Sequence, residues 1–447
     1  MDMFTRRSFL LSSTAALAAC AAQPRTGGTA ASQFVRREGT AFRLGGAAYR
    51  YAGANIWYAA YLGADAPFGN RDRLRRELDA LADLGVDNLR ILGSSELSPL
   101  KNSITPGFRT AGSDYNRTLL EGLDFTLAEM GRRNMRAVLY LTNFWEWSGG
   151  MMTYLYWTNG GRYINMNDPA HPWPEFANMV SEFYSSTEAV RLYHDYVRAV
   201  VGRTNSITGR PYRDDPAIMA WQLANEPRPG GSEEVAQRQM SAYLAWIRGT
   251  AQLIKSIDPN HLVSTGSEGL QGCVGSDACV VAAHEPAEVD YLTAHIWPQN
   301  WGWADPKDLP GTFANVEAKT RDYIAQHVAL AQRLGKPLVI EEFGFPRNTG
   351  RFDPAAATTW KDRFYGVIYD AALENVRGGG VIAGTNFWAW GGEGRAQHPD
   401  YAFVRGDLSY MGDPPHEPQG WYSVLATDET SKALIRAHAA AMKGMRV

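Results

Sequence analysis

The 447-residue chain has little cysteine, no excess of either charge and no long hydrophobic run. Its 44 Lys and Arg residues against 47 Asp and Glu residues leave a net charge of −3, and no basic cluster stands out. That balance argues against a nucleic-acid-binding protein. No stretch of 18 uncharged apolar residues occurs, so no membrane-spanning helix is expected. The hydrophobic share of 45% excludes a disordered chain and fits a soluble globular protein.

Metal-binding motifs are absent as well. The nine His residues are scattered, and neither His-Glu-x-x-His nor Cys-x-x-Cys occurs, so we expect no metal and no cofactor. Of the three cysteines, Cys273 and Cys279 flank a short polar loop. In an oxidising compartment these two could form a local disulfide, and two free thiols are the alternative.

The first 20 residues are typical of an export signal rather than of a folded element. Arg6 and Arg7 precede a short apolar run at 9–19, and the pair resembles a twin-arginine signal. The alternative is a buried N-terminal helix. We therefore expect export, by the twin-arginine route.

The end of that signal predicts how the protein is retained. Residues 17–20 resemble a bacterial lipobox, in which Cys20 carries the lipid, and a plain signal-peptidase site is the alternative. Residues 21–33 are rich in Ala, Gly, Thr and Ser and are expected to form a flexible tether. We expect a lipid-anchored periplasmic or cell-surface protein that meets the membrane only through Cys20.

From about residue 48 the sequence alternates short apolar runs with amphipathic stretches. The strands expected are 51–58, 86–92, 137–142, 217–223, 262–266, 291–295, 338–342 and 380–388. The helices expected are 71–84, 116–132, 187–203, 233–257, 315–334, 355–373 and 429–442. Alternation of this kind predicts a parallel sheet, and eight units predict a closed (β/α)8 TIM barrel, class α/β, with 34–447 as one catalytic domain.

Four segments fall outside that repeat. Residues 34–44 are expected to form a hairpin that turns at Glu38-Gly39 and plugs the bottom of the barrel. Residues 271–288, between the fifth and sixth strands, resemble a loop. Two long loops, 143–173 and 391–425, follow strands and are rich in Trp, Tyr, Gly and Pro. Loops after strands form the active-site face of a barrel.

One of the expected strands ends in glutamate, and another is followed closely by one. The run 218–227 places Glu226 after apolar residues, and 338–344 does the same for Glu342. A carboxylate there is destabilising without partners, so two of them at one barrel mouth indicate function. A helix cap or a structural ion pair is the alternative for either one alone. Two carboxylates across one pocket suit glycoside cleavage, in which one is the acid and the other attacks the sugar.

Other residues at strand ends fit the same chemistry. Arg90 could keep a nucleophilic carboxylate charged, Asn225 could bond a sugar 2-hydroxyl, and His295 could hydrogen-bond near the acid. Sugar rings stack on indole, and several tryptophans lie at or just beyond strand ends. These are Trp57, Trp145, Trp297, Trp301, Trp388 and Trp390. Ordinary packing is the alternative for the histidine or for any one tryptophan.

Together these motifs resemble glycoside hydrolase family 5, within the clan of retaining (β/α)8 hydrolases. Asn225-Glu226-Pro227 is similar to the acid/base motif of the family, and Glu342-Phe343-Gly344 matches its nucleophile motif. Glu341 is expected to point the other way, because side chains alternate along a strand. Arg90, Asn225, His295 and Trp388 match further active-site positions. The resemblance implies that Glu226 and Glu342 are catalytic, with carboxyl groups about 5–5.5 Å apart.

Within the family, the chain resembles the mannan-cleaving members. The segments 53–58, 142–145 and 295–303 carry that resemblance. It implies an endo-β-1,4-mannanase that cleaves mannan or manno-oligosaccharides by double displacement. Trp297 stands where many members have a tyrosine that hydrogen-bonds the nucleophile, so the tuning of Glu342 is expected to differ.

Three alternatives remain open at this point. An exo-acting mannosidase or mannobiohydrolase is one, because the loop 391–425 could wall off one end of a cleft. A β-1,4-glucanase is another. A non-catalytic carbohydrate-binding lipoprotein is the alternative from a different class, and the presence of both Glu226 and Glu342 argues against it. We expect a monomer whose partner is the mannan or oligosaccharide substrate, with no nucleic acid.

Overall fold

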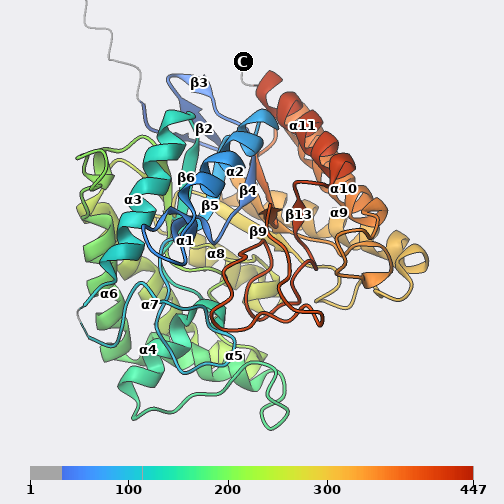
Figure 1. The fold of residues 1–447 in the computed structure, drawn as a ribbon. Helices are drawn as coiled ribbons and strands as arrows, with labels where there is room; N and C mark the ends of the chain where they lie inside the picture. Colours follow the sequence, from blue (N-terminus) through green and yellow to red (C-terminus); the bar gives the residue numbers. More distant parts are fainter. Residues whose placement is uncertain (1–32, 113, 446–447) are drawn as a thin grey trace, which may run out of the picture.

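The computed structural model describes residues 33–112 and 114–445, which fold around a barrel of eight parallel strands (Figure 1). The strands are β4 (Tyr51–Asn55), β5 (Asn88–Leu92), β6 (Arg136–Tyr140), β7 (Ile218–Gln222), β8 (Leu262–Ser264), β9 (Leu292–Ile296), β10 (Leu338–Phe343) and β11 (Ile382–Phe387). They pair in the order β8-β7-β6-β5-β4-β11-β10-β9, and a bridge between Ser264 and Tyr291 joins the two edges. The predicted (β/α)8 barrel is confirmed. The predicted export signal, the predicted lipidation site at Cys20 and most of the predicted tether lie outside the described residues.

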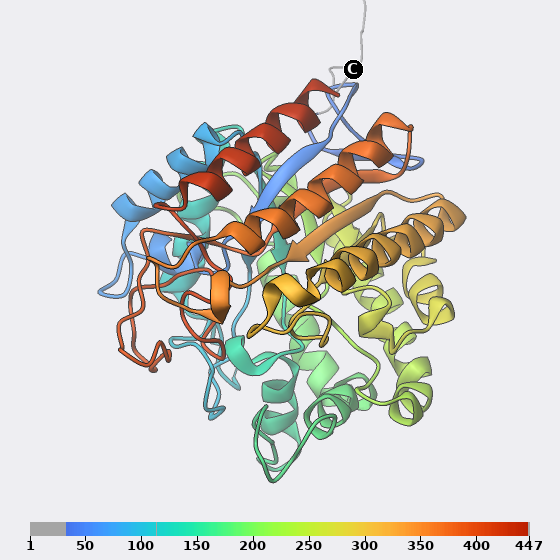
Figure 2. The same cartoon turned by 90° about the vertical axis from the view of Figure 1, so that its right-hand side faces the viewer.

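Helices surround the barrel in both views (Figures 1 and 2). The longer ones are α2 (Arg71–Asp83), α3 (Arg117–Arg132), α6 (Thr187–Val201), α7 (Glu233–Ile257), α9 (Leu309–Leu334), α10 (Thr359–Arg377) and α11 (Glu429–Gly444). In α2, Asn70 caps the first turn by accepting from the Arg73 amide at 2.9 Å, and Leu74 and Leu78 are buried. No helix of the described part of the chain is long and apolar enough to cross a bilayer.

Alternation along the strands separates the core from the barrel interior. In β5, Leu89 and Ile91 pack against the surrounding helices, while Asn88 and Arg90 point into the barrel. Arg90 therefore reaches the other side of the barrel from a strand whose five residues are all buried. This geometry brings polar side chains from distant strands to one place.

The base of the barrel is covered by the N-terminal hairpin. Strand β1 (Arg36–Glu38) pairs antiparallel with β2 (Ala41–Leu44), and β3 (Ala47–Ala48) extends the small sheet. Glu38 pairs with Ala41, so the turn is Gly39-Thr40, one residue later than expected. Gly39 has φ +59°, a conformation that favours glycine. Buried Val35 and Phe42 pack on the interior layer at the start of the barrel strands.

Two segments expected as loops contain helices. Residues 271–288 hold α8 (Asp277–His284), which Ser276 caps through the Cys279 amide, so that prediction was wrong. With eight residues, α8 is too short for its periodicity to stand out. A disulfide joins Cys273 to Cys279, with Cα atoms 5.7 Å apart.

The two long loops are only partly irregular. The first contains α4 (Gly150–Thr158), and the second begins and ends in a short pair, β12 (Trp390–Gly392) with β13 (Val424–Leu425). The other short helices are α1 (Ala59–Gly63) and α5 (Glu175–Val180), with 3-10 turns at Glu146–Ser148, Ser181–Ser185, Tyr212–Asp214, Gln271–Cys273 and Asn348–Gly350.

Candidate active site

A cavity of about 510 Å³ opens at the carboxyl ends of the barrel strands. Segments that follow strands β6 to β11 supply its walls, as expected for a barrel enzyme. Its lining includes Trp145, Trp147, His171, Trp173, Phe176, Asn225, Glu226, Arg228, Glu268, Gln271, Trp297, Asn300, Trp301, Glu342, Trp388, Pro414, His416 and Glu417. Both predicted catalytic glutamates are among them.

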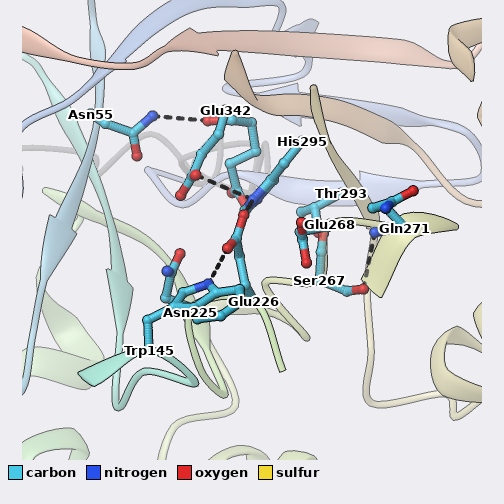
Figure 3. Close-up of polar contacts among 12 residues, drawn as sticks. Asn55, Trp145, Asn225, Glu226, Ser267, Glu268, Gln271, Thr293, His295 and Glu342 are labelled. Carbon is cyan, nitrogen blue, oxygen red and sulfur yellow. Dashed lines mark hydrogen bonds and ion pairs between the residues drawn. The ribbon is translucent and has the colours of Figure 1, made fainter. Parts of the chain in front are cut away.

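Glu226, just after β7, and Glu342, in β10, face one another across this cavity (Figure 3). His295 of β9 stands between them, with Nδ1 2.6 Å from Glu226 Oε1 and 3.3 Å from Glu342 Oε2. One oxygen of each carboxylate lies within 4.8 Å of the other. Inverting glycosidases need about 6.5–9.5 Å to admit a water molecule, so this spacing suits a retaining mechanism.

Glu226 is held from several sides. Its backbone has φ +51°, in the left-handed region, which is uncommon for a residue with a side chain. The amide of Glu226 donates to the Gly266 carbonyl at 2.8 Å, and Trp145 Nε1 donates to the carboxylate. The Arg228 guanidinium lies over the Trp145 ring, 5.0 Å from its centroid. The chain thus fixes the carboxylate in a strained position at the cavity.

Arg90 links Glu342 to the neighbouring strands. Its guanidinium donates to Glu342, and also to Gln222 Oε1 and Asn225 Oδ1, both at 2.8 Å. The Asn225 amide in turn donates to Asn143 at 3.0 Å. Arg90 has no exposed surface, so its charge acts on Glu342 without screening by water.

Glu341 points into the barrel, so the prediction that it would point away from the site was wrong. In β10, Val339 faces the interior and Ile340 faces the helices, so alternation alone turns Glu341 inward. A register shift between Ile340 and Glu342 then forms a bulge, which brings Glu342 inward too. Glu341 Oε2 lies 3.4 Å from Arg90 Nε and 3.5 Å from His295 Nε2. The site therefore holds three carboxylates around two cations.

These charges decide where the proton sits. Burial lowers the pKa of His295, but the Glu342 charge and hydrogen bonds to the glutamates hold it well above its usual value. Burial raises the pKa of Glu226, yet the hydrogen bond and charge of His295 bring it below the usual value. Burial raises the pKa of Glu342, and the His295 and Arg90 charges oppose that rise. In the free site the proton therefore resides on His295, beside Glu226.

Four of the predicted tryptophans line the cavity, namely Trp145, Trp297, Trp301 and Trp388. Trp57 does not, and its assignment to the substrate site was wrong. It is 1% exposed and packs edge-on against Trp147 and Tyr410, because the second long loop folds over it. Trp390 is buried in the same way.

Trp297, which stands where many family members have a tyrosine, packs against two other aromatic rings. Its ring lies 5.0 Å from that of Tyr422 and 5.9 Å from that of Trp388. A Cβ atom on Gly344 would come within 2.6 Å of the Trp297 ring, so glycine leaves the space that the indole fills. The described partners of the Glu342 carboxylate are Arg90 and His295 instead.

Several lining residues were missed by the sequence analysis. Arg228 binds Glu268 through Nε at 2.6 Å, and this pair lies beside Glu226. Burial and the Glu226 charge raise the pKa of Glu268 to about 7. Arg228 directly follows Asn-Glu-Pro, so its place at the site could have been inferred. No comparable signal marks Glu268, or His416 and Glu417 in the second long loop.

Glu226, His295 and Glu342 also form a group whose ligand atoms lie within 4.8 Å of one another. A metal ion there would meet the Arg90 guanidinium and the proton of His295, which already donate to the carboxylate oxygens. The donor set therefore fits a proton-transfer site better than a metal site. The absence of a cofactor stays a prediction.

Replacing Glu341 by glutamine is expected to lower the pKa of His295, because one of its anionic partners is lost. Activity that depends on this proton should then disappear at lower pH than in the wild type, which shifts the alkaline limb of the rate profile. Stability should fall by about 1–3 kcal/mol. Rate profiles from pH 4 to 9 and thermal unfolding measure both effects.

Glu77→Gln is the matched control, because Glu77 is equally buried and pairs with Arg73 away from the cavity. It should lose stability with an unshifted profile. Identical profiles for Glu341→Gln and the wild type would show that Glu341 does not set the charge of His295.

Comparison with known proteins agrees with this geometry. The family model described as "GH family 5 beta-mannosidase-like" matches residues 32–446. Mannan endo-1,4-beta-mannosidase 1 of Oryza sativa is 30% identical over 79% of this chain and 78% of its own length. Mannan endo-1,4-beta-mannosidase 1 of Arabidopsis thaliana is 29% identical over 79% of this chain and 81% of its own length.

Solved structures give the same result. A family 5 mannosidase from Rhizomucor miehei superposes with a TM-score of 0.84 and 33% identity, covering 93% of this chain and 99% of its own. An endo-1,4-beta-mannanase from the same fungus reaches 0.65 with 22% identity, covering 92% and 99%, a likeness in fold alone. The chain therefore belongs to glycoside hydrolase family 5, among its β-mannosidase-like members.

Proposed function

We propose that this glycoside hydrolase cleaves β-1,4-mannosidic bonds by double displacement, with Glu342 as the nucleophile and Glu226 as the acid and base. The proposal is carried by one observation: two buried carboxylates meet across a tryptophan-lined cavity at a spacing that suits a retaining mechanism. The two plant relatives named above are mannan endo-1,4-beta-mannosidases, which favours mannose in the bond that is cut.

The first step uses the proton of His295. Substrate binding displaces water from the cavity, and His295 Nδ1 passes its proton along the 2.6 Å hydrogen bond to Glu226 Oε1. Glu226 becomes neutral, so its repulsion of Glu342 ends. The attraction of the His295 charge is lost in the same transfer, and the Arg90 charge then keeps Glu342 ionised. Glu226 is then protonated and Glu342 is ionised, which are the states that the acid and the nucleophile require.

Bond cleavage follows from this arrangement. Glu342 attacks the anomeric carbon while Glu226 protonates the leaving oxygen, which gives a glycosyl-enzyme and a free sugar hydroxyl. Glu226, now a carboxylate, takes a proton from water, and the resulting hydroxide equivalent releases the mannosyl unit from Glu342. Glu226 then returns its new proton to His295 Nδ1 along the same hydrogen bond, which restores the initial state of the site, and the product keeps the β configuration.

A second candidate differs in where the chain is cut. Pro414, His416 and Glu417 of the second long loop line the cavity, and Asp413 holds that loop by accepting from the Gly420 amide at 2.7 Å. Burial raises the pKa of Glu417 well above its usual value, and its Oε2 has no partner among the described residues. A loop fixed at one end of the cavity, with Glu417 free to hydrogen-bond a sugar hydroxyl, would suit the end of a sugar chain. This favours an exo-acting β-mannosidase.

Digestion of β-1,4-mannohexaose tests both candidates. Proton NMR of the first products should show the β anomer, and chromatography should show either mannose alone from the start, for exo action, or mid-length oligosaccharides, for endo action. Glu342→Gln is the blank. An α anomer at early times would overturn double displacement, and equal cleavage of cellohexaose would favour the glucanase alternative.

The place of action is part of the same proposal. The N-terminal 20 residues carry the pattern of an export signal with a lipobox, which supports export by the twin-arginine route and a lipid on Cys20. We infer a monomer anchored in the periplasm or at the cell surface. Mass spectrometry of the native N-terminus tests the lipid.

A further inference from the structure

A second cavity, of about 650 Å³, lies at the opposite end of the barrel. It is bounded by the end of α3, the segment that leads into β7, and the turn between β2 and β3. Its polar lining comprises Gln33, Arg132, Asn134, Arg136, Thr208, Arg210 and Asp215. Leu44, Leu127 and neighbouring alanines make the rest of the wall apolar.

The charge in this cavity is unbalanced. Arg136 and Arg210 have no carboxylate partner among the described residues. Arg136 Nη1 donates to the Met135 carbonyl at 3.2 Å, and its Nε is buried without a hydrogen bond. Arg132 pairs with Glu129. Asp215 is the one acid among the described lining residues, and its Oδ1 already accepts from the Ala217 amide at 3.0 Å. A guanidinium left unpaired in such a place is stabilised by an anion, and phosphate matches its fork.

The positive surface extends over the hairpin. Arg36 Nη1 donates to the Asn260 carbonyl at 2.7 Å, and Arg37 Nη1 donates to the Asp290 carbonyl at 3.5 Å. Neither has a carboxylate within ion-pair distance in the described chain. Four arginines of the barrel base are thus without a carboxylate partner, although the whole chain has a net charge of −3.

The arginine-rich surface lies close to the start of the described chain, and therefore close to Cys20 along the sequence. Gln33, the first described residue, lines the cavity and lies thirteen positions after Cys20, with residues 21–32 between them. Such a segment spans at most about 45 Å. A lipid on Cys20 would therefore keep the barrel base close to the bilayer. Residues 21–32 contain Arg25 and no acidic residue, so this segment is itself a poor occupant of a cavity lined by arginine.

We propose that the arginine-lined cavity at the barrel base binds the anionic phospholipid headgroups of the membrane that holds the lipid anchor. The inference rests on the anchor proposed above. Bound in this way, the barrel stands with its base on the membrane, and the cavity that holds Glu226 and Glu342 opens away from it, toward soluble or wall-bound sugar chains. Anionic surface charge attracts each nearby arginine within a Debye length.

Vesicle binding by the full chain with Cys20→Ser tests the surface apart from the anchor. We expect it to bind phosphatidylcholine vesicles containing 30% phosphatidylglycerol and to be released by 0.5 M salt. The double variant Arg136→Gln/Arg210→Gln should bind about 30-fold more weakly. Arg162→Gln/Arg351→Gln, which changes two exposed arginines in loops after β6 and β10, removes equal charge and should bind within about twofold of the wild type.

Three outcomes would overturn the proposal: no binding to the anionic vesicles, equal binding to pure phosphatidylcholine, or equal loss in both double variants. Inorganic phosphate at millimolar concentration should compete only weakly if a lipid surface is the ligand, and full displacement by phosphate would assign the cavity to a free anion instead. Mannan hydrolysis should be unchanged in both double variants. A lack of hydrolysis in all proteins would count against the proposed function and leave the vesicle result intact.

Discussion

Glu342→Ala should lower the rate of mannan hydrolysis by about 10⁵–10⁶-fold, the order of loss seen when the nucleophile of a covalent mechanism is removed. Without this carboxylate no glycosyl-enzyme forms, and Arg90 and His295 cannot replace it because both are cations that donate to it. Initial rates of reducing-sugar release from mannan measure the effect.

Azide separates this role from simple damage to the site. With an aryl β-mannoside, azide can enter the space left by Glu342 and attack the anomeric carbon once, so the product should be the α-mannosyl azide. Glu342→Gln, which keeps the shape of the side chain, should be equally inactive and should unfold close to the wild-type temperature. Substantial hydrolysis by either folded variant would remove Glu342 from the nucleophile role.

Glu226→Ala should lower mannan hydrolysis by about 10²–10⁴-fold, the usual contribution of general acid–base catalysis. The loss should depend on the leaving group. A sugar oxygen needs the proton that Glu226 supplies, whereas a nitrophenolate leaves without one, so the first step on a nitrophenyl β-mannoside should change little. A burst of nitrophenol followed by slow turnover would show that the glycosyl-enzyme accumulates, because no base is left to activate water.

In this variant azide should give the β-mannosyl azide, because Glu342 still forms the intermediate and the anion then attacks it. Trp145→Phe is the companion control: it removes one donor to Glu226 and leaves the acid in place, so its effect should be smaller and alike for both substrates. An equal loss on mannan and on the aryl mannoside in Glu226→Ala would show that the residue does not protonate the leaving group.

The reactive centre could be predicted because it depends on order along the chain. Asn-Glu-Pro after the fourth barrel strand and Glu-Phe-Gly in the seventh placed Glu226 and Glu342 at the same end of one barrel. Arg90 and His295 lie against them because alternate residues of neighbouring strands share the barrel interior. What the local pattern could not supply was the bulge that lets Glu342 point inward beside Glu341, since a bulge depends on how two strands pair.

The walls of the cavity were harder to predict for a related reason. Trp57 follows its strand as closely as Trp145 does, yet it is covered by Tyr410, which lies more than 350 residues later. His416 and Glu417 lie in a segment without hydrophobic periodicity, so no pattern places them at the mouth. Long irregular loops are positioned by contacts between distant residues, and those contacts leave no local trace in the sequence.

The contact between Gly344 and Trp297 links the identities of two positions that lie 47 residues apart. A methyl group at position 344 would collide with the indole of Trp297, so a tryptophan fits at 297 only where residue 344 is glycine. In descendants of this sequence, a side chain at 344 should therefore arise only after the ring at 297 has become smaller. Any redesign of the surroundings of Glu342 has to change residues 297 and 344 together.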